Sequence, residues 1–275
     1  MTDQNKKTVL ITGASSGIGK AAAERFLNAG WIVYAASRRV EKMEDLGARG
    51  ATVMSIDVTK EEDLQRVVTA IETEHGALDV LVNNAGYSES GAIEDVPIDD
   101  ARYQMEVNVF GLVRLTQLVL PKMRQQGSGC IINISSIVGK ITFPVSGWYS
   151  ATKHTLEAVT DALRFEVAPF GIDVVLIEPG AIRTEFQSVA VQAVAENSQT
   201  GPYANLARAY MTMLEARTSD NTPGPEVVAE MIYRAASARR PKTRYPVPFS
   251  ARLFILLRSL TPDRIWDILL RTRFR

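Results

Sequence analysis

A short apolar run that leads through a glycine-rich turn into a helical pattern is the feature that most constrains this fold. Residues 8–12 (TVLIT) predict a buried strand, residues 13–19 (GASSGIG) a tight turn, and residues 20–30 a helix. The spacing Gly-x-x-x-Gly-x-Gly lets the backbone turn sharply and lets free N–H groups at a helix N-terminus approach a pyrophosphate. The unit therefore predicts an α/β sheet with a dinucleotide site. Its candidate binding residues are Gly13, Ser15, Ser16, Gly17, Ile18 and Gly19.

The alternation of strand and helix continues along the chain. Further apolar runs predict strands at residues 31–37, 51–58, 78–86, 130–135, 171–180 and 243–248. Helical patterns lie between them, at about 60–75, 98–124, 150–168 and 223–235. This order predicts the α/β class, with a doubly wound parallel sheet of about seven strands and helices on both faces. We expect a single domain over residues 1–248 and a C-terminal helical extension over residues 249–275.

The carboxyl ends of the strands carry the candidate cofactor-binding residues. The second strand ends in Ser37 and Arg38 and has no acidic residue there. An acidic residue at this point accepts hydrogen bonds from a ribose 2′-hydroxyl, whereas an arginine pairs with a 2′-phosphate. The sequence therefore favours NADP(H), against the alternative that Arg38 and Arg39 only solvate a loop. Other candidate contacts are Asp57, Val58, Asn84, Ala85, Gly86, Pro179, Gly180, Ile182 and Thr184.

A tyrosine and a lysine four residues apart supply the candidate chemistry. Tyr149 and Lys153 share one face of the helix predicted over residues 150–168. A free tyrosine has a pKa of about 10, and a nearby ammonium favours the phenolate, so we expect Lys153 to lower the pKa of Tyr149. Ser136 follows the apolar run 130–135, at the strand end where an open parallel sheet binds its ligand.

An asparagine lies inside the helix predicted over residues 98–124. Asn108 is mildly unfavourable there, so a buried Asn108 would have a function such as bending the helix and holding a water. An exposed Asn108 would need no such explanation.

Six segments together resemble the short-chain dehydrogenase/reductase family. They are TGASSGIG at 12–19, NNAG at 83–86, Asn108, Ser136, YSATK at 149–153 and PGAIRT at 179–184. By motif the resemblance covers residues 8–184, and residues 223–235 are similar to the helix before the family's last strand. It implies a Rossmann-type sheet, an NADP-dependent enzyme acting on CH–OH donors, and a homo-dimer or homo-tetramer formed through the helices of Asn108 and Tyr149.

The resemblance also implies four catalytic roles. Tyr149 protonates the substrate carbonyl oxygen as hydride arrives from the nicotinamide, and Ser136 hydrogen-bonds the same oxygen. Lys153 lowers the pKa of the tyrosine and binds the nicotinamide ribose, and Asn108 holds a water that relays protons to Lys153. Ser135 is the rival for the serine role, but the thirteen-residue spacing to Tyr149 favours Ser136. His154 is interpreted as structural. No residues are assigned to a metal.

In this family the segment between Thr184 and Pro223 is the variable substrate lid, here about residues 185–222. Two amphipathic helices with a Gly-Pro break fit its sequence, and it has no cluster of basic residues for a charged substrate. A lipophilic ketone, aldehyde or secondary alcohol is therefore favoured. Residues 143–186 are similar to the branch that contains 17β-hydroxysteroid and retinol dehydrogenases. The apolar candidates are Phe143, Val145, Trp148, Phe186, Val189, Val191, Val194, Tyr203, Tyr210, Met211, Met213 and Leu214.

Two alternatives to an NADPH-dependent carbonyl reductase remain. A 3-oxoacyl thioester reductase shares every motif, although the long arm of a thioester needs an open channel. An NADPH-sensing regulator or scaffold belongs to a different class. The intact Asn-Ser-Tyr-Lys set argues against a sensor, because a sensor does not need the proton relay.

The C-terminal extension is basic and amphipathic. From Arg239 to Arg275 the chain has ten Arg or Lys residues and two Asp. The pattern over residues 249–275 predicts two short helices broken at Pro262. They either pack on the body of the protein or lie on an anionic membrane surface as a peripheral contact.

Composition limits the remaining classes. The formal net charge is zero, which argues against a nucleic-acid partner. The single cysteine, Cys130, lies in an apolar run, so core packing and a reducing compartment are expected. The N-terminus is polar and leads directly into the first strand, so no signal peptide is expected. The predicted location is cytoplasmic, with membrane association through the extension as the alternative.

Overall fold

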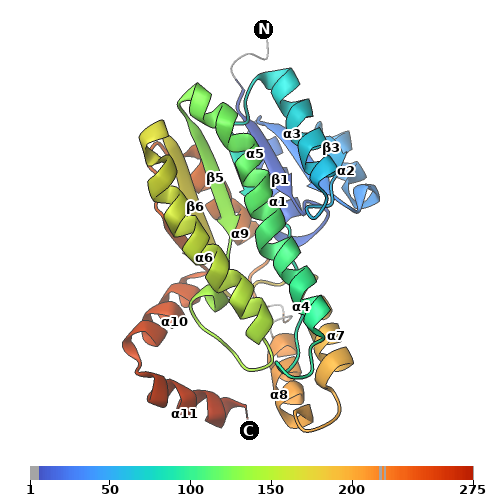
Figure 1. Cartoon of the computed structure of the whole chain (residues 1–275), viewed down its shortest axis with the longest axis vertical. Coiled ribbons are helices and arrows are strands. Elements are labelled where there is room, and N and C mark those ends of the chain that lie inside the picture. The colour runs from blue at the N-terminus through green and yellow to red at the C-terminus, as the bar shows by residue number, and fades with distance from the viewer. Residues whose placement is uncertain (1–5, 217–218, 220, 275) are drawn as a thin grey trace.

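The computed structural model describes residues 6–216, 219 and 221–274. Its centre is a seven-stranded parallel sheet in the order β3-β2-β1-β4-β5-β6-β7 (Figure 1). The strands are β1 (Thr8–Thr12), β2 (Ile32–Ser37), β3 (Thr52–Ser55), β4 (Val80–Asn83), β5 (Gly129–Ile134), β6 (Ile172–Pro179) and β7 (Arg244–Val247). The predicted α/β class, the doubly wound sheet and the seven parallel strands are confirmed.

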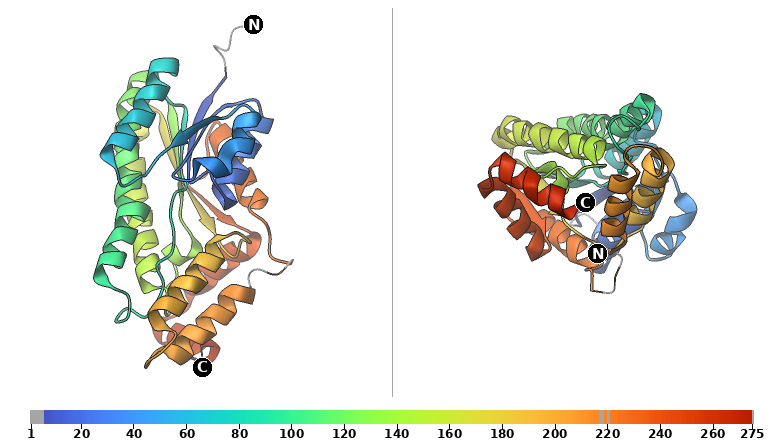
Figure 2. Two further views of the ribbon diagram at one scale, coloured as in Figure 1. Left: turned by 90° about the vertical axis from the view of Figure 1, so that its right-hand side faces the viewer. Right: turned by 90° about the horizontal axis from the view of Figure 1, so that it is seen from below.

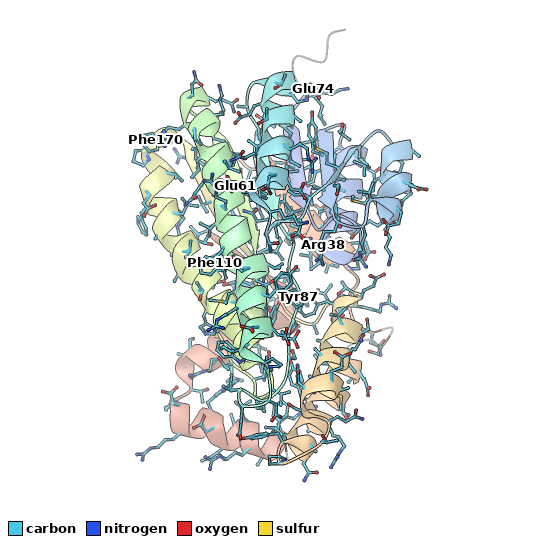
Figure 3. All side chains as sticks on the ribbon, turned by 45° about the vertical axis from the view of Figure 1, so that its right-hand side comes forward. Arg38, Glu61, Glu74, Tyr87, Phe110 and Phe170 are labelled. Atoms are coloured by element: carbon cyan, nitrogen blue, oxygen red, sulfur yellow. The ribbon has the colours of Figure 1, made fainter. Side chains whose placement is uncertain are left out.

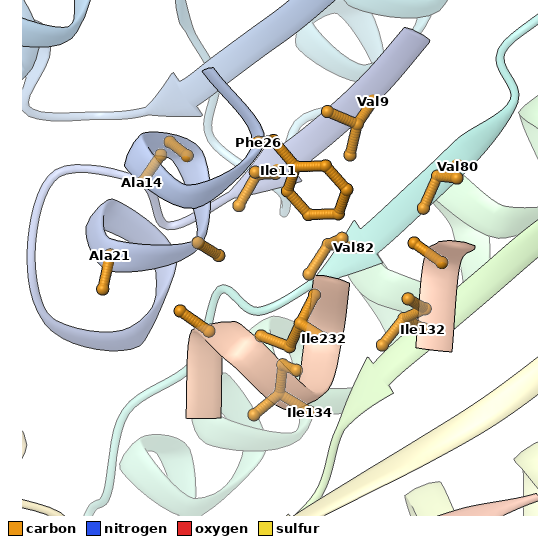
Figure 4. Packing of buried hydrophobic residues seen from close by; sticks show 14 of the residues in the cluster. Val9, Ile11, Ala14, Ala21, Phe26, Val80, Val82, Ile132, Ile134 and Ile232 are labelled. Atoms are coloured by element: carbon orange, nitrogen blue, oxygen red, sulfur yellow. The ribbon is translucent and has the colours of Figure 1, made fainter. Parts of the chain in front are cut away.

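Helices cover both faces of the sheet because the side chains of a strand alternate between its two sides (Figure 2). Val9 and Ile11 of β1 point to one side, where Phe26 and Ile232 pack against them (Figure 4). Leu10 points to the other side and joins a second core that contains Leu115. The first face is covered by α1 (Gly17–Asn28), α2 (Glu44–Ala48) and α9 (Glu226–Ser237), and the second by α3 (Glu61–His75), α5 (Gly111–Gln126) and α6 (Gly147–Val167).

Two predicted elements differ from the structure. The strand predicted over residues 51–58 ends at Ser55, because the Asp57 carboxylate accepts hydrogen bonds from Thr59 N and Oγ1 in a local turn. The helix predicted over residues 98–124 is divided into α4 (Ile98–Met105), a π-helical turn (Glu106–Phe110) and α5.

Four helices lie beyond the carboxyl ends of the strands, at the end of the molecule opposite the N-terminus (Figures 1 and 2). They are α7 (Phe186–Ser198), α8 (Ala204–Glu215), α10 (Phe249–Leu260) and α11 (Asp263–Arg273). A third apolar core joins them to the loop before α6 through Phe143, Tyr210 and Trp266. The predicted helix pair of the lid and the pair broken at Pro262 are both present. Among the described helices, none is both long and apolar enough to cross a bilayer.

Candidate active site

One cavity of about 500 Å³ lies at the carboxyl edge of the sheet. It extends from the ends of β1, β2 and β4, where the strand order reverses, to the start of α6 and the helices of the lid. Open α/β sheets bind their ligands at such a reversal. Sequence-predicted residues that line it are Gly13, Ser15, Ser16, Gly17, Ile18, Ser37, Arg38, Asp57, Val58, Asn84, Ala85, Gly86, Ser136, Tyr149, Lys153, Pro179, Gly180, Ile182 and Thr184. Gly19 and Asn108 are buried behind the wall of the cavity.

Asn84 and Thr12 hold the ends of β1 and β4 together under this cavity. The Asn84 Nδ2 group donates to the carbonyl oxygen of Thr12 at 2.9 Å. The backbone N–H groups of Asn84 and Ala85 also donate to Thr12, both to its Oγ1 atom at 3.0 Å. These bonds fix the distance between the two strands, so the crevice between them has a defined width.

The glycine turn approaches these strand ends too closely for a side chain. Gly13 has φ +67°, and a Cβ on it would lie 2.9 Å from Asn84 Nδ2. A Cβ on Gly19 would lie 2.4 Å from the carbonyl oxygen of Gly13. The turn leads directly into α1, which begins at Gly17 and has no acidic residue in its first turn. Free N–H groups therefore face the cavity beside backbone that carries no side chains. This arrangement fits the pyrophosphate of a dinucleotide.

Basic and hydroxyl side chains gather at the β2 end of the cavity. Arg39 donates from Nε and Nη2 to Ser15 Oγ, at 3.2 and 3.1 Å, and from Nη2 to Ser16 Oγ at 2.9 Å. Ser37 Oγ donates to Ser15 Oγ at 2.9 Å. Arg38 lines the same end and lies on the same face of the molecule as Tyr87 (Figure 3). Arg38 was assigned from the sequence and Arg39 was not, although its position directly after Arg38 was a usable signal.

Tyr149 and Lys153 lie one turn apart on α6, as predicted, and both line the cavity. Lys153 Nζ lies 5.8 Å from the centre of the Tyr149 ring. Burial raises the pKa of Tyr149 above its ordinary value, the neighbouring Tyr210 adds to this, and a hydrogen bond with Ser136 opposes it. The lowering expected from Lys153 is therefore not found in this structure, where desolvation of the phenolate is the largest cause of the shift. A neutral phenol is the form that donates a proton.

Burial also disfavours the charged form of Lys153, and it lowers the pKa of this side chain from 10.5 to about 8. The carboxylate of Glu157 partly opposes this shift. Lys153 Nζ donates to the carbonyl oxygen of Ile134 at 2.8 Å. Its ammonium is therefore held at the end of β5.

Asn108 is fully buried in the π-helical turn. Its Nδ2 group donates to the carbonyl oxygen of Tyr87 at 2.8 Å and to Thr152 Oγ1 at 3.2 Å, and its Oδ1 atom accepts from Tyr87 N at 3.0 Å. The side chain thus joins the loop after β4 to α6. Both ends of the amide therefore have protein partners, and the role of Asn108 in holding a water stays a prediction.

The two other residues weighed from the sequence have different surroundings. Ser135 Oγ is buried and has no hydrogen-bond partner among the described residues, and Ser135 also lines the cavity. Only Ser136 among the two serines contacts the Tyr149 hydroxyl, as its effect on the pKa of Tyr149 shows. His154 is exposed on the helix surface, and its Nδ1 atom contacts the carbonyl oxygen of Ser150 at 2.9 Å.

The end of the cavity beyond Tyr149 is apolar. The Phe186 ring lies 5.3 Å from the Tyr149 ring, between centroids. Other lining side chains are Phe143, Val189, Tyr210 and Leu214. Some apolar candidates of the lid do not line the cavity: Val194 is in the third core, and the Tyr203 hydroxyl donates to Glu94 at 2.6 Å.

A charged cluster around two buried carboxylates, those of Glu157 and Glu178, was not found from the sequence. Glu157 binds Lys140 at 2.8 Å and Arg244 at 3.0 Å, and Arg244 also binds Asp161 at 2.7 Å. Glu178 Oε1 lies 3.4 Å from Arg244 Nε. Burial and then the charge of Glu157 raise the pKa of Glu178 to about 7. No motif could have shown this cluster, because its members are far apart in the sequence.

Comparisons with known proteins agree with this arrangement. The family model for short chain dehydrogenases matches residues 7–195. The NADPH-dependent 3-dehydrocapnine reductase of Ornithobacterium rhinotracheale is 37% identical and covers 94% of each chain. The 3-ketodihydrosphingosine reductase of Bacteroides thetaiotaomicron is 36% identical and covers 96% of each chain.

Solved structures resemble the whole chain as well. A short-chain dehydrogenase from Streptomyces avermitilis has a TM-score of 0.83 and 34% identity, covering 98% of this chain and 97% of the other. A single-site variant of actinorhodin polyketide ketoreductase, solved with NADPH, has a TM-score of 0.76 and 29% identity, with coverage of 90% and 97%.

Proposed function

The chain belongs to the short-chain dehydrogenase family and is an oxidoreductase, and on this premise we propose that it reduces the ketone of a lipophilic substrate with NADPH. The observation that carries the proposal is the polarity of one cavity. Arginines lie at one end, apolar side chains at the other, and Tyr149 lies between them. A phosphorylated dinucleotide and a lipophilic ketone would meet at that tyrosine.

The selection of NADPH rests on Arg38 and Arg39. Both line the cavity at the end of β2, where an adenosine ribose is read in this kind of sheet. Arg39 is held by Ser15 and Ser16, so its guanidinium stays beside the glycine turn. A fixed guanidinium suits the bidentate recognition of a phosphate. The NADPH-dependent relative supports the same assignment.

The roles of this chain's residues follow from their protonation states and contacts. Bound NADPH would supply the hydride. The Tyr149 phenol is neutral because burial raises its pKa, so it holds the proton that a reduced carbonyl oxygen requires. Ser136 contacts the Tyr149 hydroxyl. It adds a second hydrogen-bond donor for the charge that develops on the substrate carbonyl oxygen. The Lys153 ammonium stabilises the tyrosinate that remains after proton transfer.

The apolar end of the cavity supports a lipophilic substrate. Phe143, Phe186 and Leu214 surround the space beyond Tyr149, and apolar walls of this kind select by burial rather than by charge. The names of two relatives, a 3-ketodihydrosphingosine reductase and a 3-dehydrocapnine reductase, support a long-chain ketone as the first substrate class. Steroids and retinoids are the second class.

The test follows the absorbance of the reduced nicotinamide with NADPH and, separately, with NADH. The carbonyl panel contains long-chain 3-keto amines, steroids, retinoids and 3-oxoacyl thioesters. We expect turnover of a long-chain or polycyclic ketone with NADPH, and its loss in Tyr149→Phe, which keeps the ring and removes the proton donor. Cofactor binding should remain in this variant.

Each of three other outcomes would contradict one part of the proposal. Preferred turnover of the thioester would identify a 3-oxoacyl thioester reductase. Tight NADPH binding without turnover of any carbonyl would support an NADPH sensor. Equal turnover by Tyr149→Phe would contradict the catalytic role of the phenol.

A further inference from the structure

The helix α10 has apolar side chains on two opposite faces. Its inner face, with Ala251, Phe254 and Ile255, packs in the third core. The Phe254 ring lies 6.1 Å from the Phe143 ring, which is in the wall of the cavity. The opposite face carries five large apolar side chains at helical spacing, and all of them are exposed: Phe249, Leu253, Leu256, Leu257 and Leu260. Leu260 is 75% exposed and Phe249 78%.

The following helix α11 also has exposed apolar side chains. Trp266 and Phe274 are buried against the body, whereas Ile265, Ile268 and Leu269 are exposed. Together the eight exposed side chains of α10 and α11 form what we call the outer face. Eight large exposed apolar side chains on two consecutive helices are unusual for a surface that faces only water.

Positive charge borders the outer face. Residues 249–274 contain five arginines and two aspartates. Arg258 pairs with Asp263 at 2.6 Å. Arg252, Arg264, Arg271 and Arg273 are exposed and form no ion pair with the acidic residues of the described chain. Apolar side chains with unpaired arginines beside them match the interface of an anionic bilayer.

The charge also discriminates between two possible partners of the outer face, a second copy of this chain and an anionic bilayer. A symmetric contact between two copies would place the same arginines opposite or beside one another. Only Asp267 would then be available to neutralise them, because Asp263 already pairs with Arg258. Like charges at such a contact oppose association, whereas anionic lipid head groups would neutralise them.

We propose that the outer face docks on the surface of an anionic phospholipid bilayer, with α10 and α11 lying in the plane of the interface. The inner face of α10 reaches the wall of the cavity through Phe143 and Phe254. Docking therefore places the apolar end of the cavity next to the hydrocarbon layer. This inference concerns the surface alone and does not depend on which ketone the cavity accepts.

The experiment is sedimentation of the full chain with vesicles, in two compositions. One is phosphatidylcholine alone, and the other is equal parts of phosphatidylcholine and phosphatidylglycerol. We expect the protein to sediment with the anionic vesicles, less so at high salt, and to stay in solution with the neutral ones. Binding to neither vesicle, or equal binding to both, overturns the proposal.

Two variants separate the apolar and the basic contributions. The double variant Leu256→Gln with Leu260→Gln should lower the partition onto vesicles by on the order of 10-fold or more, because it removes two leucine side chains that would be buried in the lipid interface. Arg264→Gln with Arg271→Gln should lower it by about fivefold per arginine, and only with anionic vesicles. Phe165→Gln is the matched control, since Phe165 is 76% exposed on α6, outside the outer face. Unchanged partition of the first two variants contradicts the proposal.

Light scattering without vesicles tests whether the outer face binds a second copy of the chain instead. If the parent is an oligomer that Leu256→Gln with Leu260→Gln converts to monomers, the outer face joins two copies and the membrane proposal is wrong. NADPH binding by every variant shows that the fold is intact, so loss of sedimentation is not a consequence of unfolding.

Discussion

Lys153 Nζ lies 2.8 Å from the carbonyl oxygen of Ile134, so the helix that carries Tyr149 is tied to the end of the central strand β5. The bond positions the buried ammonium and gives it a hydrogen-bond partner at the end of β5. A buried ammonium with so few partners is costly, and its lowered pKa of about 8 reflects that cost. The residue that the proposed chemistry requires is therefore one that the folded state would be more stable without.

We predict that Lys153→Met abolishes turnover and stabilises the protein at neutral pH. Below the folded pKa of about 8 the ammonium carries its full desolvation cost, and methionine fills the same space without charge. The free energy of unfolding at pH 7 should rise by roughly 1–3 kcal/mol, less what the lost hydrogen bond contributed. Denaturant unfolding measures this.

The pH dependence provides a check with a definite sign. Between the folded pKa of about 8 and the ordinary value of 10.5, the unfolded chain binds a proton that the folded chain does not. This group therefore makes the parent more stable as pH rises through that window, and the methionine variant lacks the effect. Lys140→Met is the control: its ammonium pairs with Glu157 at 2.8 Å, so its loss should destabilise. Stabilisation by both variants, or by neither, would refute the argument.

We predict that Arg39→Ala weakens NADPH and leaves NADH unaffected. A hydrogen bond to a charged group contributes about 1.5–3 kcal/mol, so the KM for NADPH should rise roughly 10-fold to 100-fold. Arg49→Ala is the control, since Arg49 pairs with Glu24 at 3.4 Å and does not line the cavity. Steady-state kinetics with both cofactors measure the effect. An equal loss for NADH would mean that Arg39 supports the turn rather than a 2′-phosphate.

We predict that Glu178→Gln stabilises the protein above neutral pH. The raised pKa of about 7 means that the folded chain keeps a proton that the unfolded chain releases near 4.5. The parent should therefore lose stability as pH rises from about 4.5 to 7, by roughly 1–3 kcal/mol, whereas glutamine cannot ionise. The two proteins should differ little at pH 4 and most at pH 8 in thermal unfolding.

Glu157→Gln is the matched control for this prediction. Glu157 is equally buried but has two cationic partners, Lys140 and Arg244. Its neutralisation leaves those cations with less compensation, so the variant should be less stable than the parent at pH 7 and above. If the two glutamine variants behave alike, the difference between a paired and an underpaired carboxylate has been assigned wrongly.

We predict that Gly19→Ala damages cofactor binding through packing. The added Cβ would lie 2.4 Å from the carbonyl oxygen of Gly13 and 2.5 Å from Asn84 Nδ2, so the two walls of the crevice must separate. Overpacking of this kind costs about 1–3 kcal/mol and should lower both the Tm and the affinity for NADPH. In Gly47→Ala the added Cβ meets Val53 Cγ2 at an ordinary 3.5 Å, so this control should be unaffected. Unaltered NADPH affinity in Gly19→Ala would contradict the prediction.

The strands of the sheet and most of the cavity could be predicted because their signals are local. Buried strands such as β4 read as continuous apolar runs, and strand ends carry the ligand-facing residues. Asn108 was recognised as unusual in a helix, and the structure gives the reason, which is its contact with the backbone of Tyr87. The sequence thus showed that Asn108 is unusual in a helix, but it did not show which residues Asn108 contacts.

What could not be predicted depends on burial and on contacts between distant segments. The predicted direction of the pKa shift of Tyr149 was wrong because the sequence shows the nearby Lys153 but not the burial that raises the pKa of the tyrosine. The cluster of Glu157, Glu178 and Arg244 forms only when α6, β6 and β7 come together. The position of Arg39 directly after Arg38 was a usable signal, but its contact with Ser15 crosses from one strand end to another and is not visible in the sequence.

The π-helical turn at Glu106–Phe110 limits how the length of this chain can vary among related proteins. Such a turn contains one residue more than an α-helical turn, so a single deletion there would restore a regular helix with its backbone hydrogen bonds intact. The deletion would also rotate α4 by about 100° relative to α5. Gln104, which donates to the carbonyl oxygen of Glu89 at 3.0 Å, would then face another direction. The segment should therefore accept substitutions at exposed positions such as Phe110 but neither an insertion nor a deletion.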